Sequence, residues 1–123
     1  MGAVDFQVAA GHFSEDQSPF LSPHRVSEIL GVTRSELAKL VGVARNTLTA
    51  KSGARKVDQA LSPVARILAM VTEMAGDESR AVIWFKHQPI PGWAGKTAYD
   101  LVGEGKADKV LAYLEAVRSG VYA

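Results

Sequence analysis

Helix start and stop signals divide most of this chain into short segments, and they constrain its fold more than any other feature. Ser22 followed by Pro23 is typical of a helix start, because proline at the first helical position loses no hydrogen bond, and Gly31 ends that segment. Thr33 and Glu36 then have the spacing of a capping box. No stretch supports a β-strand or an internal repeat. The sequence therefore predicts an all-α fold.

The second half of the chain repeats these signals. Ser62 and Pro63 predict the start of the main core helix, and Gly76 predicts its end. We expect its apolar residues to face the core: Val64, Ile67, Leu68, Met70, Val71 and Met74. Further helices are predicted from Asp77, from Thr97 and within residues 104–120. In the last of these we expect four residues to face inward: Val110, Leu111, Leu114 and Val117. Residues 52–60 are predicted as a loop, and residues 88–96 as a rigid, turn-rich connection.

The formal net charge of +1 is unevenly distributed along the chain. Residues 23–66 carry eight basic side chains against three acidic ones, for +5, whereas residues 1–22 carry −3 and residues 67–123 carry −1. A basic middle suits contact with a polyanion such as DNA, although an ordinary solvated surface has the same composition.

The stretch "SELAKLVGVARNTLTA" carries the spacing of a helix-turn-helix. Ala38 is small where two helices approach closely, and Gly42, four residues later, suits a turn with a positive φ. Val43 fills the corner, and Leu48 packs the third helix onto the first two. We therefore predict a helix-turn-helix lobe followed by a small helical C-terminal bundle.

In that geometry, outward positions of the third helix face the major groove of DNA. Arginine pairs with guanine and asparagine with adenine, while threonine reaches phosphate or a thymine methyl group. The predicted DNA-binding residues are Arg45, Asn46, Thr47, Thr49, Lys51, Arg55 and Lys56, the last three near the phosphate backbone. Two alternatives stay open: the polar residues only solvate a helix start, or the motif persists as a packing module that no longer reads DNA.

These patterns divide the chain into three regions. Residues 1–21 show no sustained period and are expected to form a flexible arm, residues 22–61 form the helix-turn-helix region, and residues 62–123 form the C-terminal bundle. The start of the chain is a poor signal peptide, no stretch approaches the length of a membrane span, and cysteine is absent. We expect a cytoplasmic protein.

The last 40 residues resemble the toxin-binding domain of Xre/MbcA/ParS-type antitoxins. In that family a tryptophan-bearing helix leads to a proline turn, a Gly-Lys-Thr helix start, an Asp-Leu pair and an amphipathic helix that ends in Gly-x-Tyr. The matching residues here are Trp84, Pro89, Pro91, Gly95, Lys96, Thr97, Asp100, Leu101, Gly105, Val110, Leu114, Gly120 and Tyr122. Ala98 stands where a proline is common, and alanine suits the first turn of a helix.

The resemblance implies a type II antitoxin whose partner is a RES-domain toxin, an enzyme that attacks NAD or uses it to modify a target. It further implies that the C-terminal tail enters the toxin's active-site cleft, which would bury Val121 and Tyr122 and bring the Ala123 carboxylate to basic groups. The expected toxin-binding residues are Trp93, Lys96, Arg118, Gly120, Val121, Tyr122 and Ala123. The alternatives are that the tail folds back onto its own domain, and that Trp93 is a lid over the bundle's own core.

Nothing in the sequence indicates catalysis. The three histidines lack the i, i+4 spacing of a helical metal site, and Gly95-Lys96-Thr97 lacks the earlier glycine of a phosphate loop. We therefore expect no enzyme activity, no cofactor and no metal, and we expect operator DNA and a second copy of the chain as further partners. The alternatives are a transcription regulator whose C-terminal bundle only dimerises, and a small hydrolase.

Overall fold

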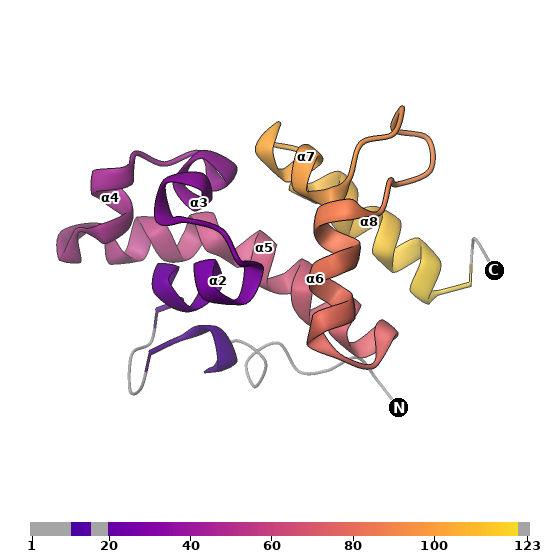
Figure 1. The fold of residues 1–123 in the computed structure, drawn as a ribbon, viewed down its shortest axis with the longest axis horizontal. Helices are drawn as coiled ribbons and strands as arrows, with labels where there is room; N and C mark the ends of the chain where they lie inside the picture. Colours follow the sequence, from indigo (N-terminus) through magenta and orange to yellow (C-terminus); the bar gives the residue numbers. More distant parts are fainter. Residues whose placement is uncertain (1–10, 16–19, 121–123) are drawn as a thin grey trace.

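The computed structural model describes residues 11–15 and 20–120, apart from the side chain of Lys51. Across these residues the chain forms seven α-helices and two short 3-10 helices, with isolated β-bridges and no strands (Figure 1). The predicted all-α fold is confirmed. None of the described helices combines the length and the apolar character that crossing a membrane requires.

Three α-helices come first, and the first two begin and end at the predicted residues. They are α2 (Pro23–Leu30), α3 (Arg34–Val41) and α4 (Arg45–Thr49). The Thr33 side chain accepts a hydrogen bond from the Glu36 backbone while the Glu36 side chain accepts one from the Thr33 backbone, so the predicted capping box is present. Gly42 ends α3 with φ of 74°, in the left-handed region that favours glycine.

The long helix α5 (Ala54–Ala75) differs from the prediction at its start. The expected loop over residues 52–60 is instead the end of the 3-10 helix η2 (Lys51–Gly53) and the first two turns of α5, and Pro63 lies inside the helix. Val57, Leu61 and Val64 are all at most 2% exposed and continue one buried stripe. Their burial outweighs the hydrogen bond that a proline removes, so the Ser-Pro signal did not mark the helix start.

The last three α-helices gather at the other end of α5. They are α6 (Glu78–His87), α7 (Ala98–Gly103) and α8 (Ala107–Arg118). Helices α6 and α8 pack against α5, and α7 contacts both of them (Figure 1). The Asp77 side chain caps α6, and Thr97 and Asp100 form a second capping box at the start of α7. Both helix starts agree with the prediction.

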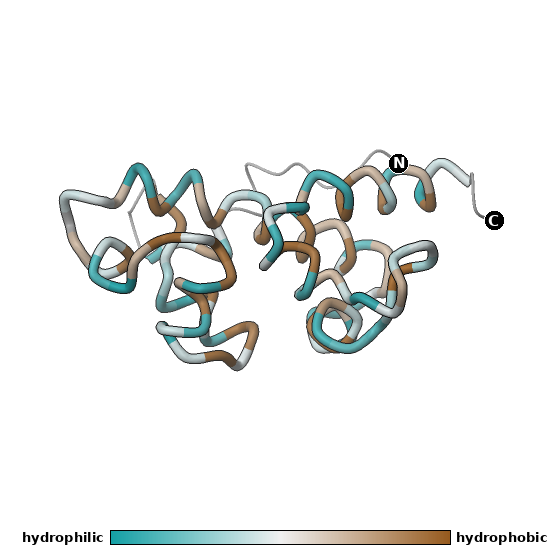
Figure 2. The backbone as a smooth tube through the Cα atoms, turned by 90° about the horizontal axis from the view of Figure 1, so that it is seen from above, coloured by the Kyte–Doolittle hydropathy of each residue, from teal (hydrophilic) through white to brown (hydrophobic). Residues whose placement is uncertain are grey.

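One hydrophobic core runs through both ends of the molecule. Apolar residues recur along each helix beside polar ones, as expected when every helix has one buried face (Figure 2). Helix α3 contacts α7, and the Lys86 Nζ atom donates a hydrogen bond to the Leu30 carbonyl oxygen at the end of α2, at 3.0 Å. The predicted boundary between residues 61 and 62 falls within α5, which both regions share.

Most predicted core positions are buried, with a few differences. Val64, Ile67, Leu68 and Val71 are buried as expected, and so are Val110 and Leu114, whereas Leu111 and Val117 are half-buried. Met70 is half-buried, and Met74 is 39% exposed, so the prediction that Met74 fills the core is wrong. Met74 lies in the last turn of α5, beside a hollow described below.

The described part of the N-terminal arm is packed against the helices. Phe13, in the 3-10 helix η1 (Gly11–Phe13), and Leu21 are both buried. The Leu21 backbone N–H donates to Asp58 Oδ1 of α5 at 2.7 Å. The expectation of a flexible arm therefore does not apply to these residues, and residues 1–10 and 16–19 lie outside the described part of the chain.

Candidate functional site

The connection between α6 and α7 folds into a tight loop around Ile90. This side chain is 2% exposed, and the Ile90 backbone N–H donates to the Lys96 carbonyl at 2.8 Å. Gly92, Ala94 and Gly95 all have positive φ, with Ala94 at 54°. The predicted turn-rich connection is thus present. The role of Ile90 as its anchor was missed, although an apolar residue between two prolines signals burial.

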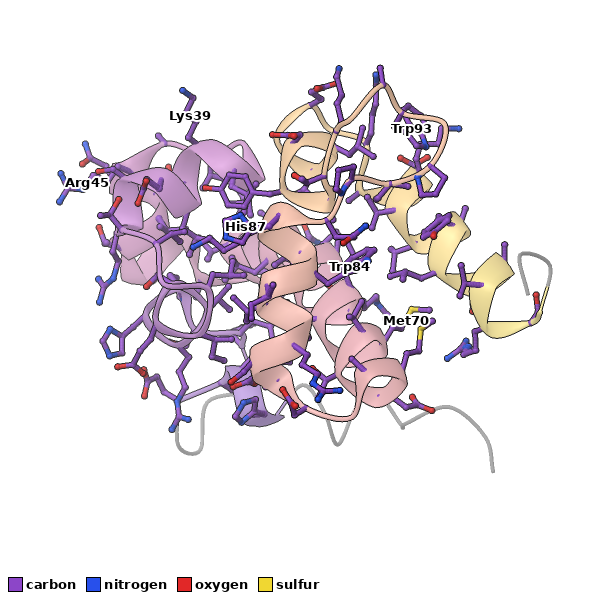
Figure 3. All side chains as sticks on the ribbon, turned by 45° about the vertical axis from the view of Figure 1, so that its right-hand side comes forward. Lys39, Arg45, Met70, Trp84, His87 and Trp93 are labelled. Carbon is purple, nitrogen blue, oxygen red and sulfur yellow. The ribbon has the colours of Figure 1, made fainter. Side chains whose placement is uncertain are left out.

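Trp93 lies half-buried at the tip of this loop, against the core cluster (Figure 3). The Lys106 Nζ atom is 5.5 Å from the centroid of its ring, a distance typical of a cation–π contact. Glu104 lies between two cations, with Oε2 2.7 Å from Lys96 Nζ and Oε1 3.3 Å from Lys106 Nζ. The hydrogen bond from Lys96, followed by the one from Lys106, holds the pKa of Glu104 below its ordinary value. These contacts bring Trp93 and Lys96, two predicted toxin-binding residues, together in one cluster.

The other predicted toxin-binding residues follow the end of α8. The Arg118 guanidinium pairs with the Glu115 carboxylate one turn earlier. Gly120 is exposed and has φ of 86°, so the backbone leaves the helix direction at this point. Val121, Tyr122 and Ala123 lie outside the described residues.

A hollow that the sequence did not reveal lies where α5, α6 and α8 meet. It has a volume of about 180 Å³ and is lined by Val71, Met74, Ala75, Trp84, Tyr113, Leu114 and Val117. Trp84 occupies the space between α6 and α8 (Figure 3). Beside it on α6, Ile83 is 61% exposed. One signal was available: residues 81–85 are five consecutive apolar residues, and a helix cannot turn all of them toward one core.

The predicted helix-turn-helix has the expected internal packing. Ala38 and Leu48 are each 3% exposed, and Val43 is half-buried against the core. The Val43 backbone N–H donates to the Ala38 carbonyl at 3.0 Å, which closes the turn. Helix α4 therefore takes the position of the third helix in the motif, although it has only five residues.

The predicted DNA-binding residues do not all face outward equally. Arg45 and Asn46 are exposed, and Arg45 projects from the outer side of the molecule (Figure 3). Thr49 is exposed, but its hydroxyl donates back to carbonyls of its own helix. Thr47 is half-buried and packs closely against Gly53. A Cβ atom added to Gly53 would lie only 3.0 Å from the Thr47 carbonyl oxygen. Only part of α4 is thus free to contact a ligand.

Arg55 and Lys56 extend this basic surface onto the first turn of α5. Both are exposed, and no ion pair among the described residues neutralises them or Arg45. Nothing is described of the Lys51 side chain. Within residues 11–15 and 20–120, no three histidine, aspartate or glutamate side chains gather as metal ligands would.

The end of the molecule that contains α6, α7 and α8 matches a known protein family. Residues 70–120 match the family described as "Antitoxin Xre/MbcA/ParS C-terminal toxin-binding domain". The match begins inside α5, includes all of α6, α7 and α8, and ends at Gly120. Residues 70–120 therefore carry the toxin-binding domain of this antitoxin family, and the resemblance noted in the sequence is confirmed over these residues. No curated protein and no solved structure matches the chain.

Proposed function

We propose that this antitoxin neutralises a RES-domain toxin, an enzyme that attacks NAD or uses NAD to modify a target. In this proposal Gly120, Val121, Tyr122 and Ala123 enter the active-site cleft of the toxin and exclude NAD. The observation that carries it is the match to a toxin-binding domain, which extends to Gly120, the first residue of this tail. The proposed mechanism is steric occlusion, and it needs no chemistry from the antitoxin.

The physical case for the tail rests on what its residues gain from burial. A valine and a tyrosine together remove a large apolar area from water, and tyrosine is a frequent anchor of protein interfaces because its ring packs while its hydroxyl stays hydrogen-bonded. The left-handed Gly120 lets the chain turn away from the axis of α8. Trp93, Lys96 and Arg118 are proposed as further toxin contacts.

Deleting the tail tests this mechanism directly. A chain that ends at Ser119 should fold like the full chain but should no longer rescue the growth of cells that express the toxin. Tyr122→Ala should rescue growth only partly, because one anchor is lost while the rest of the tail remains. The matched control is Ser52→Ala, an exposed position far along the chain from the tail. Full rescue by the truncated chain, at normal expression, would show that the tail does not block the toxin.

We also propose that the chain represses its own operon as a homodimer that binds an operator. Three observations support this: the packing of α2, α3 and α4, the exposure of Arg45 and Asn46 on α4, and the exposure of Arg55 and Lys56 on the first turn of α5, which form no ion pair with another described residue. A two-fold dimer would present two such helices to two half-sites. In this proposal Thr47 and Thr49 contribute less than Arg45, because one packs against Gly53 and the other bonds its own helix. Lys51 is proposed as a phosphate contact on its charge alone.

A transcription regulator whose C-terminal bundle only dimerises is the second candidate. The helix-turn-helix packing favours it as much as it favours autorepression. Loss of the tail separates the two functions, because a pure regulator would bind DNA and regulate normally without residues 120–123 and would have no toxin to neutralise.

A further inference from the structure

The hollow between α5, α6 and α8 is an open, apolar surface that the core does not fill. Its lining consists of aliphatic and aromatic residues, with Trp84 as one wall and Val117 and Tyr113 of α8 as the other. Its volume of about 180 Å³ is comparable to the roughly 150 Å³ of a protein cavity that accepts benzene. One leucine, methionine or phenylalanine side chain of a partner would therefore fit.

Two large apolar side chains of the described residues are exposed near Trp84. Met74, which lines the hollow, is 39% exposed, and Ile83, which lines a second hollow that shares Trp84 with the first, is 61% exposed. Single exposed apolar residues are common, but two of them at hollows that share one tryptophan form a larger apolar patch of the kind that marks an interaction site. We call Met74, Ile83, Trp84, Tyr113 and Val117 the Trp84 face.

Every residue of the Trp84 face lies within residues 70–120, the segment that matches the toxin-binding domain. Val117 is also one turn before Gly120, where the proposed tail begins. The face is thus continuous with the surface from which the tail departs. This placement favours the toxin as its occupant over a second copy of the chain.

We infer that the Trp84 face is a docking site for the toxin, distinct from the tail, and that it binds an apolar side chain on the toxin surface outside the active-site cleft. The inference rests on the proposed function only in that the partner is the cognate toxin. In this arrangement the face supplies affinity and orients the toxin, whereas the tail supplies the block. The two contributions can therefore be lost separately.

The experiment measures the affinity of purified full-length variants for the toxin encoded by the reading frame that adjoins this chain's gene. Met74→Lys and Ile83→Lys, singly and together, place a charge on the face at positions that are already exposed. The double variant should bind the toxin at least ten times more weakly than the unaltered chain. Gln59→Lys, an exposed residue of α5 outside the toxin-binding domain, is the matched control and should change affinity by less than two-fold.

The same measurement on the chain that ends at Ser119 separates this inference from the tail proposal. We expect the truncated chain to retain measurable toxin binding and to lose it when the two lysines are added. If the lysines weaken binding only when the tail is present, the face serves the chain's own last residues and the inference is wrong. If the truncated chain still inhibits the toxin but the lysines weaken binding, the tail proposal fails and the inference stands.

Two further outcomes would overturn the docking site. One is unchanged toxin affinity of the double variant with a native circular dichroism spectrum. The other is unchanged affinity together with a shift from dimer to monomer in sedimentation, which would assign the face to a second copy of the chain. Should the double variant fold poorly, Ile83→Lys alone decides the question, because this side chain is mostly in solvent.

Discussion

At the scale of single residues, Arg45 is the side chain on which the proposed DNA reading most depends. It is exposed at the start of α4, and no ion pair among the described residues competes for its guanidinium. Thr47 and Thr49, by contrast, are partly occupied by contacts within the protein. The sequence could place all three on one short helix, but it could not show that two of them were engaged elsewhere.

Arg45→Ala is therefore expected to weaken binding to the chain's operator by about 1–3 kcal/mol, the loss typical of one bidentate contact with guanine. Binding to unrelated DNA should fall much less, because sequence-independent affinity comes from contacts with the phosphate backbone. Gel-shift titrations at two salt concentrations measure both effects. Arg66→Ala, in the middle of α5, serves as the control for a lost positive charge. Equal losses on specific and unrelated DNA would mean that Arg45 contacts phosphate and does not read bases.

At the scale of elements, the sequence predicted helix ends better than it predicted helix faces. Capping residues and glycines act within one turn, so Ser22, Thr33, Gly42 and Asp77 mark their boundaries correctly. The start of α5 depends instead on the burial of Val57, and this burial comes from packing against other parts of the chain and not from neighbouring residues. The apolar run over residues 81–85 signalled that part of α6 would be exposed, but that Ile83 and Met74 are the exposed residues depends on where α8 lies relative to α5 and α6.

Pro63 tests the extent of α5. Inside a 22-residue helix it removes a backbone hydrogen bond, so Pro63→Ala is expected to raise the free energy of unfolding by about 1–2 kcal/mol, after the greater freedom of the unfolded alanine chain offsets part of the gain. If the helix began at Ser62, proline would occupy its first position and the same substitution would be neutral or destabilising. Urea denaturation of the two chains distinguishes these results. Ala60→Gly, within the same stretch of helix, should lower stability by up to about 1 kcal/mol and confirms that the assay responds to helix propensity.

At the scale of the whole molecule, the two regions predicted from sequence share one helix and one core. The contact of α3 with α7 and the hydrogen bond from Lys86 to Leu30 add links between them. The sequence indicated two functions in two segments, and it gave no information on whether the segments fold separately. The order of the two segments along the chain could be predicted from sequence. Their packing against each other could not, because it arises from contacts between residues more than 50 positions apart.

We therefore expect the full chain to unfold in a single cooperative transition. Both tryptophans, Trp84 and Trp93, lie at the α5–α8 end, so their fluorescence reports on that end alone, whereas far-ultraviolet circular dichroism reports on all helices. The two signals should give the same midpoint in urea, because neither end retains a complete core without the other. Separate midpoints would show that the helix-turn-helix end unfolds independently.

The continuity of α5 sets the spacing of the two proposed partners. At about 1.5 Å per residue, its 22 residues span about 33 Å from Ala54, near the basic surface, to Ala75, beside the Trp84 face. A toxin and an operator bound to one copy of the chain would sit near opposite ends of this fixed length. The diameter of the toxin then decides whether it clears the double helix or collides with it, and so whether the toxin joins the repressor on its promoter or removes it.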